Sequence, residues 1–140
     1  MSSSEKPNTA AGETELDVLI RSMQPVLHNE TYVFATVDFN FDVTGLSPLM
    51  SFKEQKGQTL ILGKTAATEA GIDYEFPCQM ITLNIHSSLD AVGFLARITT
   101  HLAQLNIGVN PVSGFYHDHL FVPSNRATDA IEALGTLSNS

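Results

Sequence analysis

The apolar residues of this chain recur with two different periods, and these periods divide the sequence into short elements. Over 81–86 three apolar residues alternate with polar ones, which predicts a strand with one covered face. Over 89–105 apolar residues recur every three or four positions, which predicts a long amphipathic helix that ends near Asn106 and Gly108. The chain therefore mixes strands and helices.

Caps, breakers and strand-forming residues predict the remaining elements. A first helix is expected from Thr14, which opens a capping-box pattern, to about Gln24, because Pro25 has no backbone donor. The other predicted elements are a strand at 32–37, a hairpin at 51–54 and 59–62, a helix at 64–70 stopped by Gly71, a hairpin at 109–116 and 119–122, and a last helix at about 127–137. The stretch 38–48 has no clear assignment.

The order of these elements, αβββα followed by βαββα, indicates an internal duplication. Residues 60–62 and 67–70 align with 120–122 and 127–130 at a constant shift of 60 positions, each time as a strand that leads into a helix. The expected fold class is α+β, with tandem ferredoxin-like units whose antiparallel sheets carry helices on one face. The first half lacks an opening strand and the second lacks a closing one, so we expect completion across the halves or by a second chain.

Composition and charge narrow the classes of function. The 140 residues are 43% hydrophobic, and seven basic against fifteen acidic side chains give a net charge of −8 without any basic cluster, so a nucleic acid is not an expected partner. No apolar stretch is long enough to span a bilayer, and the polar residues 1–13 are interpreted as a disordered tail without a secretory signal. A single cysteine, Cys78, excludes an internal disulfide and favours a reducing, cytoplasmic location.

The second half, 80–137, resembles an ACT domain, a βαββαβ unit found in regulatory parts of amino-acid metabolic enzymes. A polar loop after the strand at 81–86, the pair Val92-Gly93 at the helix, and the stretch from Phe115 to Pro123 carry the resemblance. The residues at 32–34, 52–54, 57, 59 and 60 are similar to small bacterial tandem-ACT proteins of unassigned function, a group similar in turn to the CASTOR arginine sensors. The resemblance covers about 14–137 and divides the chain into units at 14–77 and 78–140.

The resemblance implies a ligand site where the strand at 81–86 leads into the long helix. In ACT relatives a ligand lies in such a cleft, and free helix N-terminal amides suit a carboxylate. The expected ligand-binding residues are Ser87, Ser88, Leu89, Asp90, Val92 and Gly93, with Asn110 and Pro111 opposite. The alternative is that Ser87 and Asp90 only cap the helix and that Gly93 only packs against the sheet.

A group of histidines is the other candidate for chemistry. His86 and His119 are expected on one face of the sheet, near Asp118, where they could bind a metal ion or transfer protons. His117 is expected to point away, and no helix carries an HxxxH or HExxH pattern, so turn or interface roles are favoured and neither a metal nor a cofactor is expected. Nucleophile-elbow and phosphate-loop motifs are absent from the sequence.

Three functions compete at this point. The first is a sensor that binds a small molecule, most readily an amino acid, and acts on an unidentified downstream protein. The second is a structural module that dimerises without a ligand, and the third is a metal-dependent enzyme. We expect the first, in a homo-oligomeric protein that is not an enzyme and does not bind membranes.

Overall fold

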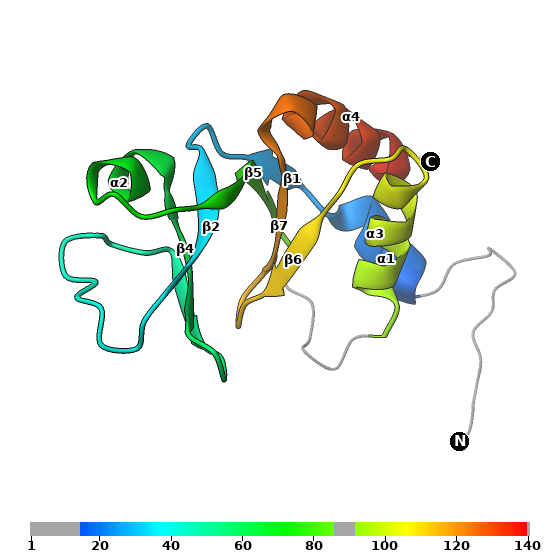
Figure 1. The fold of residues 1–140 in the computed structure, drawn as a ribbon. Coiled ribbons are helices and arrows are strands. Elements are labelled where there is room, and N and C mark those ends of the chain that lie inside the picture. Colours follow the sequence, from blue (N-terminus) through cyan, green and yellow to red (C-terminus); the bar gives the residue numbers. More distant parts are fainter. Residues whose placement is uncertain (1–14, 86–91, 140) are drawn as a thin grey trace, which may run out of the picture.

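The computed structural model describes residues 15–85 and 92–139, so the expected tail at 1–13 lies outside the described residues. The elements in chain order are α1 (Glu15–Ser22), β1 (Pro25–Leu27), β2 (Tyr32–Val37), β3 (Met50–Lys53), β4 (Gln58–Gly63), α2 (Lys64–Glu69), β5 (Glu75–Leu83), α3 (Phe94–Ala103), β6 (Asn110–Ser113), β7 (Asp118–Pro123), the 3₁₀ turn η2 (Ser124–Arg126) and α4 (Ala127–Ser138). The predicted α+β class with ferredoxin-like sheets is confirmed (Figure 1).

The described strands form one antiparallel sheet in the order β3-β4-β2-β5-β7-β6, with β1 also paired to β5. Strand β5 serves both halves of this sheet. Its first half pairs with β2, where Tyr32 lies opposite Cys78, and its second half pairs with β7 and with β1. The expected unit boundary at 77/78 therefore falls inside a strand that the two halves share.

The chain completes both half-sheets from its own described residues. The second half receives its fourth strand from β1, which pairs with β5 although it precedes the whole first half. The prediction that the first half lacks an opening strand is wrong, because β2, β4 and β3 pair in series and the start of β5 closes that half. What this half lacks is a helix between β2 and β3. Residues 38–49 have no apolar helical period and include Gly45 at φ +84°, so they form turns.

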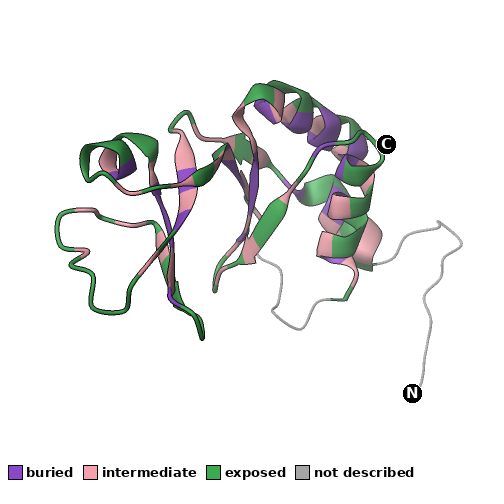
Figure 2. Ribbon diagram, viewed as in Figure 1, coloured by how far each residue is buried: buried purple, intermediate pink, exposed green. Residues whose placement is uncertain are grey.

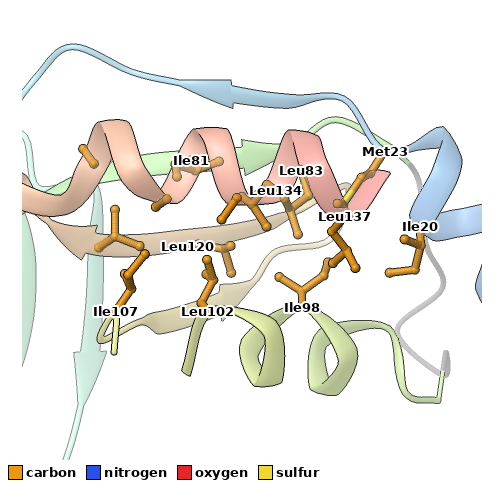
Figure 3. Packing of buried hydrophobic residues seen from close by; sticks show 14 of the residues in the cluster. Ile20, Met23, Ile81, Leu83, Ile98, Leu102, Ile107, Leu120, Leu134 and Leu137 are labelled. Atoms are coloured by element: carbon orange, nitrogen blue, oxygen red, sulfur yellow. The ribbon is translucent and has the colours of Figure 1, made fainter. Parts of the chain in front are cut away.

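The helices cover one face of the sheet. The main cluster packs α1, α3 and α4 against side chains of β5 and β7, as Figure 3 shows for Ile98, Leu102 and Leu134 around Leu120. In the other half, Ala67 of α2 packs against β2 and β4. Helix α1 and strand β1 therefore belong to the hydrophobic core of the second half of the chain.

The opposite face carries no helix among the described residues, and we call it the open face. Its apolar side chains come from both half-sheets: Tyr32, Phe34, Met50, Ile61, Phe76, Cys78, Met80, Val112 and Phe121. They alternate along the strands with the residues of the helix-covered face. Burial in Figure 2 is deepest where β5 and β7 meet the helices, and exposed residues are common on β3 and at the strand ends.

Several predicted boundaries differ from the structure. Strand β5 begins at Glu75 and ends at Leu83, whereas the predicted strand covered 81–86. The beginning of β5 was not predicted because Pro77, and Phe76 at φ +59°, interrupt the regular pattern of a strand. The second hairpin turns at 114–117, so Asp118 belongs to β7. No helix in the described part of the chain is both long and apolar enough to cross a membrane.

Candidate functional site

The N-terminal end of α3 is the described part of the expected ligand site. The helix begins at Phe94, later than predicted, because Gly93 at φ +91° has left-handed backbone geometry that cannot continue a helix toward the N-terminus. Gly93 occupies the N-cap position and has no side chain to cap the first amides of α3. The carbonyl of Gly93 accepts the first helical hydrogen bond, from the amide of Arg97 at 2.9 Å.

Gly93 lies close to α1. A Cβ atom added at Gly93 would meet the Cδ2 atom of Leu16 at 3.5 Å, which is an ordinary contact, whereas the positive φ would strain any other residue. The neighbouring Val92 is 90% exposed and lies before α3, so it is not on the apolar face of the helix as predicted. Ser87, Ser88, Leu89 and Asp90, with the capping pattern assigned to them, lie outside the described residues.

The other two predicted residues, Asn110 and Pro111, start β6. The register places Asn110 opposite Phe121 and Pro111 opposite Leu120, while Ser113 lies opposite Asp118. Asp118 in turn lies opposite Leu83, the last residue of β5. Both therefore lie at the end of the strands from which the chain continues toward α3. Asn110 is therefore about 10 Å along the strand from the edge where Ser113 and Asp118 lie.

Asp118, at this end of the strands, was predicted to lie in the turn between 116 and 119. It is only 9% exposed, and it is the one charged residue that the described part of the chain buries. Its side chain shares a face with Leu120 and Val122, toward the helices. Asp118 continues the alternation of Leu120 and Val122 by one further step toward the N-terminus, and this pattern could have predicted its position on the helix-covered face.

Three of the described histidines lie near one another on the sheet: His119 on β7, His117 on its turn and His28 after β1, whereas His101 lies on α3. The Nδ1 atom of His119 is 3.0 Å from the hydroxyl of Thr82, and the Nδ1–H of His117 donates to the carbonyl of Ile85 at 3.3 Å. Burial, followed by the nearby imidazoles of His117 and His28, lowers the pKa of His119, and Asp118 opposes this shift. His86 lies outside the described residues, and among the residues that are described no three His, Cys, Asp or Glu side chains are placed to hold a metal ion.

A second concave surface lies in the first half, at the far end of β2. The pairing of β2 with β5 reaches only from Tyr32 to Phe34, and beyond it the two segments separate around a cavity of about 670 Å³. Its lining residues are Phe34, Ala35, Thr36, Glu54, Thr59, Asp73, Tyr74 and Glu75. This volume is in the range of small-molecule sites, and the carboxylates on its lining would attract a positively charged group.

Two stretches of the chain match the description of an ACT domain, residues 11–79 and residues 75–136. They overlap inside β5, the strand that the two half-sheets share. No curated protein matches the sequence.

Solved structures of similar fold are found as well. A Vibrio cholerae protein of unknown function, described as a possible transport protein, is 40% identical, with a TM-score of 0.81 over 88% of this chain and 95% of its own. The ligand-free regulatory subunit of aspartate kinase from Thermus thermophilus shares 10% identity and a TM-score of 0.61 over 83% of this chain and 99% of its own. Escherichia coli aspartokinase III, in complex with aspartate and ADP, is similar at 14% identity and a TM-score of 0.59 over 83% of this chain and 33% of its own.

The chain thus belongs to the ACT-domain family and carries two ACT domains in tandem.

Proposed function

We propose that this protein is a regulatory sensor that binds a free amino acid and transmits its occupancy to another protein. The observation that carries the proposal is the tandem ACT match over 11–79 and 75–136. The structural likeness to the regulatory subunit of an aspartate kinase supports an amino acid as the ligand class. We further propose that the protein works in the cytoplasm and catalyses no reaction itself.

The proposed site lies at the start of α3, beside Val92 and Gly93. Backbone amides at a helix N-terminus favour a carboxylate, and Gly93 lets a ligand approach the backbone closely. The buried Asp118, opposite the last residue of β5, is a negatively charged group that could attract the ammonium group of an amino acid. Asn110 and Pro111 are retained as members of the proposed site, at its more distant end.

A second candidate function is assembly without a ligand. Phe52 of β3 is 63% exposed on the open face, next to the partly buried Met50. An exposed aromatic residue beside further apolar side chains is typical of a protein interface. In this alternative the open face would pair two copies, and the ligand would be dispensable.

A thermal-shift screen of the free amino acids and common metabolites tests the proposal. A ligand at about 100 times its dissociation constant adds roughly 2.7 kcal/mol to the free energy of unfolding, which raises the melting temperature of a domain of this size by about 5 to 10 °C. If no amino acid shifts the melting temperature while light scattering finds a dimer, assembly replaces sensing as the function.

The same screen separates the two concave surfaces. Glu75→Gln and Asp73→Asn remove charge from the cavity at the end of β2 without touching α3. A ligand that binds beside Gly93 keeps its shift in both variants, whereas loss of the shift would move the site to that cavity.

A further inference from the structure

The cavity of about 670 Å³ at the far end of β2 has a polar rim on the open face of the sheet. Phe34 belongs to the open face, and Thr36 lies on the same face two residues further along β2. The register places Thr59 of β4 opposite Thr36, and Glu75 of β5 opposite Phe34. Residues that lie opposite each other in a sheet share a face, so the pairing of distant strands assembles this rim.

Carboxylates lie on both sides of the cavity. On one side, the hydroxyl of Thr59 donates to the carboxylate of Glu54, which holds this carboxylate beside β4. On the other side, Glu75 begins β5 and Asp73 precedes it. Strand β2 lies between β4 and β5, so two strand spacings, or roughly 10 Å, separate the two sides.

The lining of the cavity offers no positive charge of its own. Its residues include three carboxylates and no lysine, arginine or histidine. Lys56 lines a neighbouring cavity that shares Thr36 and Asp73, so its charge acts mainly on Asp73. Within the described part of the chain, Glu54 and Glu75 take part in no ion pair. Two negative charges on opposite sides of the cavity are thus left without a counter-ion.

We propose that this cavity is a second ligand site, in the first ACT domain, and that it binds an aliphatic diamine. Such a ligand is a small dication without a carboxylate. The proposal goes beyond the amino-acid site at the start of α3 and does not depend on it.

The spacing of the charges selects this class of ligand. A metal ion needs its ligands close together, and among the described residues no three His, Cys, Asp or Glu side chains are placed to hold one. The carboxylate of a free amino acid would be repelled by the lining. An extended 1,4-diaminobutane has about 6 Å between its nitrogens, and a hydrogen bond of about 2.8 Å at each end lets it span the two sides. Its methylene groups would lie against Phe34 and Ala35.

Isothermal titration calorimetry at neutral pH and low ionic strength tests the proposal with three probes of equal chain length. Both amines of 1,4-diaminobutane are charged under these conditions, because such amines have a pKa of about 10. We expect this diamine to bind with one site per chain, 1-aminobutane to bind about fivefold more weakly, and 1,4-butanediol not to bind. Equal binding of all three probes, or no binding of the diamine, overturns the proposal. Magnesium ions at the concentration of the diamine should not displace it, and displacement would mean a diffuse anionic surface instead of a diamine site.

Variants assign the binding to the cavity. Glu54→Gln and Glu75→Gln should each weaken the binding of the diamine about fivefold, and the double variant about 25-fold. The matched control is the double variant Glu15→Gln and Glu132→Gln, which removes the same charge from exposed positions on α1 and α4. This control should change the affinity less than about twofold, because salt screens distant charges. An equal loss in both double variants contradicts a site in the cavity.

Gly93→Leu separates this site from the one at the start of α3. The variant should bind the diamine as the wild type does, since Gly93 does not line the cavity. Loss of diamine binding in Gly93→Leu would place the diamine at α3 and overturn the proposal. A protein that binds an amino acid but no diamine would leave the proposed sensor function standing and disprove only the second site.

Discussion

The ring of Phe34 on β2 meets the ring of Phe121 on β7 edge to face, with 5.8 Å between the ring centroids and 86° between the ring planes. Strand β5 lies between β2 and β7 in the sheet, so the two rings reach each other across β5 on the open face. Tyr32 reaches the same ring of Phe121 at 6.2 Å. Phe121 is thus a side chain through which β7 of the second ACT domain contacts β2 of the first, beside the strand β5 that the two domains share.

Replacing Phe121 by alanine should therefore weaken the joint between the domains. Because the side chain is 2% exposed, we expect Phe121→Ala to lower the free energy of unfolding by about 3 to 5 kcal/mol, measured by urea denaturation. Phe52→Ala is the control, since Phe52 is 63% exposed and its loss should cost well under 1 kcal/mol. Equal effects of the two variants would show that Phe121 is not part of the core.

The open face should mediate any self-association. We expect a dimer of twice the 15.2 kDa chain mass by light scattering, and Phe52→Glu should convert it to a monomer because the substitution places a charge on an apolar surface. Phe39→Glu is the matched control, as Phe39 is 53% exposed in the turns between β2 and β3 and makes the same change of charge. A dimer that survives Phe52→Glu would point instead to pairing of the strand edges.

Gly93 should affect ligand binding beyond its effect on stability. Gly93→Leu strains the backbone at φ +91° and fills the space before α3, so we expect both a lower melting temperature and loss of the amino-acid-induced shift. Gly45→Leu introduces comparable strain at φ +84° with no neighbouring atom within 4 Å, and it should keep the shift. A Gly93→Leu protein that still responds to the ligand would remove the start of α3 from the site.

Arg126 should stabilise the fold through its backbone contacts. Its guanidinium donates to the carbonyls of Leu105 and Asn106, each at 3.2 Å, beyond the C-terminal end of α3. We expect Arg126→Gln to lower the free energy of unfolding by about 1 to 2 kcal/mol. Arg97→Gln should change it by no more than about 0.5 kcal/mol, because the ion pair of Arg97 with Asp17 is long, at 3.7 Å, and its side chains are 45% and 33% exposed. Urea denaturation at a single ionic strength gives the free energy of unfolding of both variants. An equal loss in Arg126→Gln and Arg97→Gln would contradict a special role of the backbone contacts of Arg126.

Cys78 should be inert in the folded protein. Burial raises the pKa of its thiol to about 12, and the sulfur donates to the carbonyl of Tyr32 at 3.4 Å. At pH 9 a thiol reagent should label the protein only as fast as it unfolds. Since the unfolded thiol ionises near its ordinary pKa, stability should also fall as the pH rises above about 8.5, and Cys78→Ala should lack this component. Rapid labelling without denaturant would disprove the burial.

Local patterns were sufficient for much of the fold. Strand β2 occupies the predicted residues 32–37, the hairpin of β3 and β4 lies where its turn residues placed it, and α2 is followed by Gly71 at φ +70°. These elements are set by contacts between near neighbours: β-branched side chains, a tight turn and a helix-ending glycine. The ACT resemblance, which also rests on short motifs, is confirmed by the family matches.

Local patterns could not predict which strands pair when they lie far apart in the sequence. Strand β1 has three residues, of which the first is Pro25, too few to show a period, and it becomes a strand because β5 offers it a free edge. The start of β5 was hidden because Phe76 and Pro77 interrupt the alternation, although the edge of β2 pairs with it. His28 carries no local signal of its contacts, and only the pairing of β1 with β5 brings it to Thr82 and, through it, to His119. A strand of three residues has too few local interactions to define itself, so its place depends on which edge the rest of the sheet leaves open.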